Sequence, residues 1–133
     1  MPEFYQDDGV GGLTGKIIRA AIDVHRALGP GLLEKTYEAC LQEQLRHRGI
    51  RAARQVWLPL EFLDLKIPKA YRVDLLVEKQ VVVELKVATR LTSIDVSQVL
   101  TYLRLADLQV GLLFNFNLEA LAAGGIKRVL RTT

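Results

Sequence analysis

The sequence predicts an α/β domain, because apolar patterns typical of helices and of strands follow each other along one chain. Residues 13–28 and 32–48 place apolar side chains every three or four positions, as amphipathic helices do. Residues 55–62 alternate polar and apolar side chains, and residues 110–116 form the near-continuous apolar run of a fully buried strand. The expected order is helix, helix, three strands, helix, strand, strand.

Length and composition are those of one ordinary globular domain. The chain has 133 residues, of which 50% are hydrophobic and 25% charged, and its net charge is +3. This charge is compatible with a polyanionic partner but does not require one. Residues 1–12 are polar and glycine-rich, so we expect a loose lead-in before one domain over residues 13–133. No signal peptide or membrane span is indicated, and we expect a cytoplasmic protein without membrane association.

Side chains that bind soft metals are scarce. The chain has one cysteine, Cys40, and two histidines. An internal disulfide is therefore excluded, and no zinc site is indicated. Any metal is expected to be a hard cation bound by oxygen ligands.

The first two helices are expected to pack against each other as a hairpin. The first has Thr14 as its N-cap candidate and stops at the glycine-proline-glycine turn over residues 29–31. The second is expected to end at Arg48 and to be followed by Gly49, a residue type common just after a helix C-terminus. Its predicted buried stripe consists of Leu33, Tyr37, Cys40, Leu41 and Leu45.

The first strand is expected to bury one face. Pro59 places it at the edge of the sheet, because proline cannot donate a ladder hydrogen bond. Residues 64–70 are expected to form a loop before the next strand. The predicted inward side chains are Val56, Leu58, Leu60 and Phe62.

The last part of the chain is expected to contain one helix and two strands. Thr92 and Asp95 resemble a capping box with Asp in place of Glu, and they open a helix to about residue 106. Beyond the buried strand, residues 118–123 are expected to make one helical turn, and residues 126–131 a last strand.

Residues 71–87 are the most informative stretch, because they place charges in apolar strands. They read as a β-hairpin with Asp74 on the first arm and Glu84 and Lys86 on the second. A three-residue loop at 78–80 would place Asp74 opposite Glu84, whereas a two-residue loop would put the two acids on opposite faces. With the odd loop, two carboxylates and an ammonium group meet on one patch.

Two explanations of these charges stay open. In the first, Lys86 neutralises both acids in a structural ion-pair cluster. In the second, the surplus negative charge of the two carboxylates binds a divalent metal. The pattern of an acid, any residue and a lysine is weak by itself, since residues 64–66 repeat it within the predicted loop.

An ordered set of motifs adds a resemblance. GPGLLEKTYEACL contains Gly31, Glu34 and Tyr37, and YRVDLLVE, VVELKV, SQVLTYLRL, GLLFNFN and GIKRV follow it. From about Lys16 to Val129 the chain resembles the GxxExxY protein family, which is placed in the PD-(D/E)xK nuclease superfamily. The resemblance implies a restriction-endonuclease-like core, in which helices flank a central mixed β-sheet of four to five strands.

The resemblance also implies a catalytic site. The acidic pair of the superfamily corresponds to Asp74 and Glu84, which would hold Mg²⁺, or Mn²⁺ in its place, together with the backbone carbonyl of Leu85. Lys86 would act on the attacking water or the scissile phosphate. Glu34 would bind a second metal or a bridging water as a catalytic residue, or would only favour the dipole of its helix.

Further side chains are implied to act around this centre. Gln98 would orient the phosphate or the lysine as a catalytic residue, with Tyr102 one helical turn later. Both positions also fit an ordinary solvated helix face, and that alternative stays open. The substrate-binding residues implied are Tyr37, Tyr102, Arg72 and Arg90.

The hairpin and the resemblance together predict a Mg²⁺-dependent nuclease that hydrolyses phosphodiester bonds in nucleic acid, with DNA favoured over RNA. The alternative is a catalytically inactive nuclease-fold module that binds nucleic acid or a protein partner. Because cutting two strands often needs two sites, a homodimer is also expected.

Overall fold

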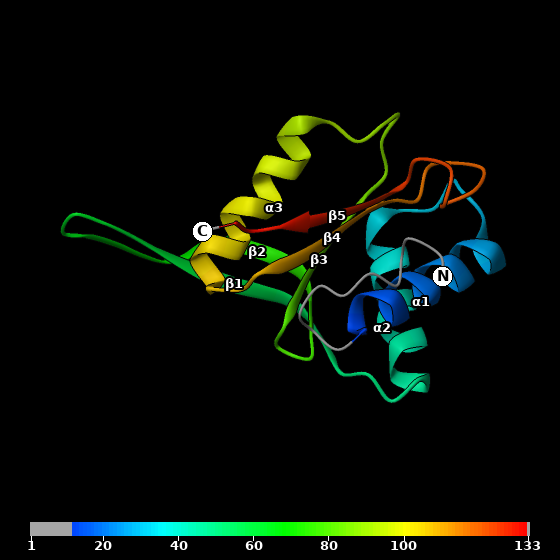
Figure 1. Cartoon of the computed structure of the whole chain (residues 1–133), viewed down its shortest axis with the longest axis horizontal. Helices are drawn as coiled ribbons and strands as arrows, with labels where there is room; N and C mark the ends of the chain where they lie inside the picture. Colours follow the sequence, from blue (N-terminus) through cyan, green and yellow to red (C-terminus); the bar gives the residue numbers. More distant parts are fainter. Residues whose placement is uncertain (1–11, 133) are drawn as a thin grey trace.

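A five-stranded β-sheet lies between helices on both of its faces (Figure 1). The computed structural model describes residues 12–132, so the predicted lead-in falls almost wholly outside the described residues. None of the helices in this range has the length and apolarity that a bilayer crossing requires. The predicted order of elements is confirmed. The elements are α1 (Leu13–Leu28), α2 (Glu34–His47), β1 (Ala52–Phe62), β2 (Leu65–Val77), β3 (Val81–Lys86), α3 (Ser93–Ala106), β4 (Val110–Asn115) and β5 (Ile126–Leu130).

The sheet is mixed, because one of its neighbouring strand pairs is parallel. Its strands follow chain order from β1 to β5. β3 and β4 run parallel with α3 as the crossover between them, and the other neighbours are antiparallel. The central strands β3 and β4 are almost entirely buried, as their apolar sequences predict. β1 lies at an edge, which confirms the prediction made from Pro59.

Each face of the sheet has its own hydrophobic core. On one face, α1 and α2 pack together over alternate side chains of β2, β3 and β4, among them Leu75, Val83 and Phe114. On the other face, α3 packs through Val99 and Leu103. The domain therefore has three layers, and the predicted packing of the first two helices against each other is confirmed.

Thr14 does not cap α1. The helix begins at Leu13, directly after Gly12 in a left-handed conformation (φ 78°). Thr14 lies inside the first turn, where it is buried and its hydroxyl accepts a hydrogen bond from Nη2 of Arg128 in β5 (3.0 Å). The predicted N-cap is therefore wrong, because this side chain joins α1 to the sheet.

The second helix starts two residues later than predicted. Leu33 is the N-cap residue in extended conformation (φ −70°, ψ 148°), so α2 begins at Glu34. Leu33 is consequently exposed, and its predicted place on the buried stripe is wrong. Gly49 follows the end of α2 with a φ of 73°, which confirms its predicted position.

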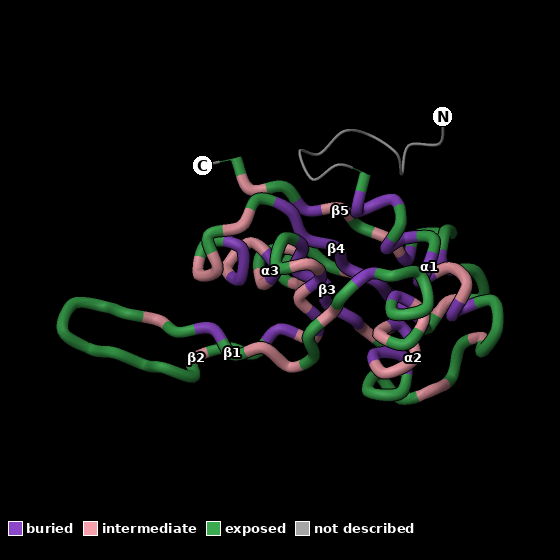
Figure 2. The backbone as a smooth tube through the Cα atoms, turned by 90° about the horizontal axis from the view of Figure 1, so that it is seen from below, coloured by how far each residue is buried: buried purple, intermediate pink, exposed green. Residues whose placement is uncertain are grey.

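The loop predicted over residues 64–70 is wrong, because almost all of it belongs to β2. β1 and β2 pair as far as Phe62 and Leu65 and form a ribbon, residues 59–70, that projects beyond the rest of the domain (Figures 1 and 2). Cross-strand pairing satisfies the backbone there, so no separate layer is needed. For the same reason Phe62 is exposed, and of the four side chains predicted to face inward only Leu58 is buried.

Residues 118–123 do not form the predicted helical turn. They make bends and hydrogen-bonded turns, including a bond from the Ala123 amide to the Ala120 carbonyl (3.1 Å). Gly124, at a φ of 96°, then reverses the chain into β5, which leaves too few residues for a helix.

Gly111 of β4 is expected to be intolerant of alanine. A Cβ atom at this position would lie 2.6 Å from Cγ1 of Val99, which would push α3 away from the sheet. Gly111→Ala is expected to lower the free energy of unfolding by about 1–3 kcal/mol, as overpacked cores do, measured by urea denaturation. Adding Val99→Ala removes the clashing methyl group, so the double variant should lose less than the sum of the single losses. Additive losses would show that the clash is not the cause.

Candidate active site

The loop of the central hairpin has three residues, which decides between the two lengths that the sequence left open. The Gln80 amide donates to the Val77 carbonyl (2.9 Å), and Val77 pairs with Val81. The loop closes because Glu78 and Lys79 both adopt left-handed conformations (φ 51° and 57°). This odd loop sets the register of the whole hairpin.

Asp74 and Glu84 consequently lie opposite each other, and the carboxyl group of each accepts a hydrogen bond from a backbone amide of the facing strand. The β2–β3 ladder extends as far as the pair Leu75–Val83. Just beyond it, Oε1 of Glu84 accepts the Asp74 amide (2.8 Å) and Oδ2 of Asp74 accepts the Leu85 amide (2.9 Å). The carboxyl groups thus replace backbone partners where the strands separate. Each uses one oxygen in this way, so both side chains are held at fixed positions before any ligand binds.

Burial gives this acidic pair unusual electrostatics. Burial and the charge of Asp74 raise the pKa of the Glu84 carboxyl from 4.5 to about 8. Burial also raises the pKa of Asp74, with a further contribution from the charge of Glu38, although the Leu85 amide acts in the opposite direction. Both carboxyl groups therefore keep a proton to higher pH than free side chains do, and the charge of Lys86 offsets only part of this shift.

Lys86 is held by α3 and not by the acidic pair. Its Nζ donates to Oε1 of Gln98 (3.0 Å). Within residues 12–132, the carboxylate within ion-pair distance of Nζ is that of Asp95 (3.9 Å), which also completes the confirmed capping box with Thr92. The structure therefore brings Gln98 to Lys86 as predicted, and it does not show the ion-pair cluster of Lys86 with Asp74 and Glu84.

Glu34 reaches the edge of this site from the first residue of α2. Burial and the charge of Asp74 raise the pKa of Glu34, while the charge of Lys86 lowers it. These interactions place a third acid within electrostatic reach of the pair. A role as a ligand or as a bridge to water stays a prediction.

Glu38 is a residue that the sequence interpretation missed. It is buried one turn after Glu34, and its carboxylate accepts hydrogen bonds from Arg54 Nε (2.9 Å) and Gln55 Nε2 (2.8 Å). Gln55 has a left-handed conformation (φ 55°), at the position where the pairing of β1 with β2 omits Asp74. The signal was present, because Glu38 lies three residues before Leu41 and so falls on the buried stripe of α2.

Asn115 is a second residue that was missed. It is buried at the end of β4, and its side-chain amide binds both backbone groups of Ala88 (3.1 and 2.9 Å). This clamp fixes the segment that leaves β3 directly after Lys86. A polar amide at the end of a buried apolar strand was the available signal.

The predicted substrate-binding residues do not lie together in the structure. Tyr37 is fully buried, stacks on Phe116 (centroids 4.5 Å apart) and binds the turn between α1 and α2 through its hydroxyl. This burial argues against a substrate contact and indicates a positioning role. Arg90 is exposed in the segment after β3, and Arg72 lies over the ring of Trp57 (5.1 Å).

Tyr102 lies beside the acidic pair. Burial and the charges of Glu84 and Asp74 raise its pKa to about 12, so its hydroxyl stays protonated at neutral pH. Its ring is 5.8 Å from that of Tyr71. A hollow of about 240 Å³ adjoins both rings. It is lined by Tyr71, Ile94, Ser97, Gln98, Thr101 and Tyr102.

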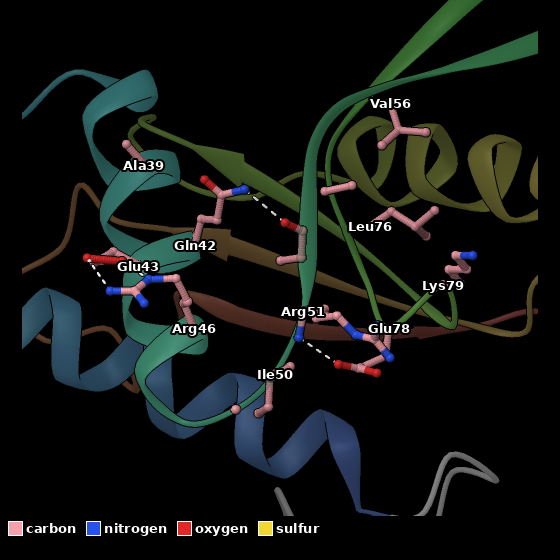
Figure 3. Close-up of a pocket in the computed structure, with 13 residues that line it drawn as sticks. Ala39, Gln42, Glu43, Arg46, Ile50, Arg51, Val56, Leu76, Glu78 and Lys79 are labelled. Atoms are coloured by element: carbon pink, nitrogen blue, oxygen red, sulfur yellow. Dashed lines mark hydrogen bonds and ion pairs between the residues drawn. The ribbon is translucent and has the colours of Figure 1, made fainter.

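A larger groove lies away from these groups. It has a volume of about 1210 Å³ and runs between the end of α2, the start of β1 and the hairpin loop (Figure 3). Its polar contacts are internal, such as the bond from the Arg51 amide to Glu78 (2.6 Å). Neither Asp74, Glu84 nor Lys86 lines it, so the groove does not contain the predicted chemistry.

The donor set fits a hard divalent cation. Within residues 12–132, no group of three or more His, Cys, Asp or Glu side chains is arranged to hold a metal ion by itself. Mg²⁺ does not require such a cage, because it usually binds one or two carboxylates and fills its remaining positions with water and phosphate oxygens. Asp74 and Glu84 supply those two carboxylates, and the nearby charge of Lys86 offsets only part of the rise in their pKa values.

These features define a class of protein. Three layers around a mixed sheet, with an acid on one arm of the central hairpin and Glu-x-Lys on the other, make a restriction-endonuclease-like fold. A family model described as the PD-(D/E)XK nuclease superfamily matches residues 12–129. The chain therefore belongs to this superfamily, whose nucleases generally use divalent metal ions. Comparisons with curated proteins and with solved structures find no match.

The raised pKa of Glu84 predicts that the stability of the fold depends on pH. Because its pKa is raised from 4.5 to about 8, the folded protein keeps a proton that the unfolded chain loses above pH 4.5. Its contribution to stability is complete below pH 4.5 and is lost as pH rises towards 8. Without metal, the free energy of unfolding is therefore expected to fall by a few kcal/mol over this range. Mg²⁺ should stabilise more at the alkaline end, since it binds the ionised carboxylates.

Urea denaturation in EDTA, repeated from acid to mildly alkaline pH, measures this effect. Glu84→Gln should flatten the profile, because the amide does not titrate. Glu119→Gln, an exposed acid in the connection before β5, should leave it unchanged. An equal pH profile in the wild type and Glu84→Gln would show that another group is responsible.

Proposed function

We propose that the protein is a Mg²⁺-dependent nuclease that hydrolyses phosphodiester bonds in nucleic acid, with DNA preferred to RNA. The observation that carries this proposal is the pre-formed arrangement of Asp74 and Glu84, with Lys86 held separately by Gln98. Membership of the PD-(D/E)XK nuclease superfamily supports it.

Each residue of the site has a proposed role in binding the metal or in acting on the phosphate. Asp74, Glu84 and the Leu85 carbonyl would hold the metal. A bound divalent ion supplies charge that polarises the phosphoryl group and activates water. Lys86, aimed by Gln98, would place a positive charge or a proton donor at the scissile phosphate. Glu34 would bind a further ion or orient water at the rim of the site.

We infer that the protein falls in the GxxExxY branch of the superfamily, on the motifs quoted above. We infer a cytoplasmic location and, for cleavage of both strands of a duplex, a homodimer.

Incubation with single-stranded and double-stranded DNA and RNA tests the activity. Cleavage is expected with Mg²⁺ or Mn²⁺ and should stop in EDTA. It should also fall by orders of magnitude in Asp74→Ala and in Lys86→Ala. Turnover that survives both substitutions would assign the activity to a contaminant or to another site.

A catalytically inactive binding module is the second candidate. One observation favours it: each carboxyl group of the acidic pair already accepts a backbone amide of the hairpin, which is a structural role that needs no metal. Calorimetric titration with Mg²⁺ separates the two candidates. Binding that is lost in Glu84→Ala supports the nuclease, whereas nucleic-acid binding without any metal binding supports the module.

A further inference from the structure

The ribbon, residues 59–70, is the least covered part of the domain. Every residue from 61 to 69 is exposed, and neither helical layer reaches it (Figure 2). Cross-strand pairs such as Leu60–Ile67 and Phe62–Leu65 hold its two strands together. It is therefore an ordered two-stranded arm, and its side chains are open to a partner.

The tip of the ribbon is apolar. Phe62, Leu63 and Leu65 are 65%, 86% and 57% exposed. Leu63 also adopts a left-handed conformation (φ 52°) in a two-residue turn, where Asn, Asp or Gly is the usual choice. Turn chemistry therefore does not explain this leucine, and a cluster of large exposed apolar side chains marks a binding surface.

The root of the ribbon, which consists of Trp57, Lys69 and Arg72, is cationic. The guanidinium group of Arg72 and the ammonium group of Lys69 lie over the ring of Trp57, at 5.1 and 5.7 Å from its centroid. Among the described residues, neither cation has a carboxylate within ion-pair distance. Trp57 thus orders two positive charges that no carboxylate of residues 12–132 neutralises at ion-pair distance.

The root is close to the candidate active site. Arg72 precedes Asp74 by two residues on β2, which corresponds to roughly 7 Å along a strand. An anion bound by Arg72 and Lys69 would therefore lie next to the acidic pair. In duplex DNA, the phosphates of one strand follow each other about every 3.4 Å of helix axis, so the scissile phosphate and a nearby phosphate of the same strand could occupy both places.

We propose that the ribbon is an arm that grips duplex DNA, with Lys69 and Arg72 on backbone phosphates and the apolar tip in the major groove. This proposal rests on the proposed nuclease function and names the form of its substrate. The major groove of B-DNA admits a two-stranded β-ribbon and presents apolar thymine methyl groups. The major groove of A-form RNA is too narrow for side chains to enter, so duplex RNA is bound less tightly.

The salt dependence of binding tests the root. Affinity for a DNA duplex is measured by fluorescence anisotropy in EDTA over a range of salt concentrations. Lys69→Gln and Arg72→Gln should each weaken binding about tenfold and reduce the salt slope by about 0.9, the value for one phosphate contact. Trp57→Leu should weaken binding without changing the slope. Lys127→Gln, which removes an exposed cation from the opposite edge strand, should change neither.

The tip is tested by Phe62→Ser and Leu63→Ser. Both changes lie on the exposed arm, so the fold should be preserved. Binding of duplex DNA should weaken on the order of tenfold at an unchanged salt slope, and binding of duplex RNA should not change. Light scattering measures the oligomeric state and so tells whether the tip binds a second copy of the chain instead of DNA. Tip variants that dissociate a dimer and keep their affinity for DNA would overturn the proposal.

Different experimental results would overturn the proposed arm and the proposed nuclease function. Unchanged salt slopes in both root variants, with cleavage that still depends on Asp74, overturn the arm and leave the nuclease. Ribbon-dependent binding of DNA, with no cleavage under any metal condition, keeps the arm and overturns the nuclease.

Discussion

Asp74→Asn is expected to abolish metal binding and to lower kcat/KM for DNA cleavage on the order of 10³-fold. Asparagine removes the negative charge but keeps a side-chain oxygen that can accept the Leu85 amide (2.9 Å in the wild type). The β2–β3 junction should therefore stay closed, and the fold should be preserved. The loss is then a loss of charge at the metal site, because a neutral amide is a much weaker ligand for a hard cation.

Calorimetry with Mg²⁺ and single-turnover cleavage measure the two effects of Asp74→Asn on the same preparation. Glu119→Gln is the matched control, since it removes one negative charge at an exposed position away from the site. Urea denaturation checks that the fold has survived. An Asp74→Asn variant that binds Mg²⁺ with wild-type affinity would remove this residue from the metal site.

The order of the elements and the composition of the acidic pair could be predicted because both depend on local patterns. Helical and strand periodicities are written in the chain itself, so two helices, three strands, a helix and two strands were readable. The register of the hairpin depends on the length of its loop, which the sequence left open between two and three residues. The left-handed conformations of Glu78 and Lys79 close the three-residue loop. Asp74 and Glu84 follow from that register alone.

The ribbon could not be predicted from its own residues. Residues 64–70 contain Pro68 and charged side chains, which are typical of a loop. They become a strand because the outer half of β1 pairs with them, beyond a register shift between Leu58 and Leu60. The partner strand decides whether a strand forms at such a position, so the propensities of residues 64–70 themselves do not reveal it.

The polar support of the site depends on tertiary contacts. Glu38 meets Arg54 and Gln55 across two elements, and Asn115 holds Ala88 across 27 positions of the chain. Helical spacing could place Glu38 on a buried stripe, but only the folded chain shows which groups satisfy its charge. Side chains of this kind are predictable as buried polar groups, and their partners are not.

Lys86→Met is expected to separate catalysis from metal binding. Methionine keeps much of the side-chain length but removes the charge, so kcat should fall by about 10²–10³-fold, as when one transition-state contact is lost. Mg²⁺ should still bind, because Lys86 is not a metal ligand and its Nζ bonds to Gln98. Asp74→Asn, by contrast, should lose both properties.

Gln98→Leu tests whether α3 positions the lysine. The change removes the acceptor of the 3.0 Å bond from Nζ while leaving the charge of Lys86 in place. A smaller loss in kcat, on the order of tenfold, is expected with an unchanged affinity for Mg²⁺, which corresponds to one hydrogen bond to a charged group. In Lys86→Met the same second substitution should have little further effect, because the bond is already absent. Independent, multiplicative losses in the double variant would mean that Gln98 acts on the substrate directly and does not act through Lys86.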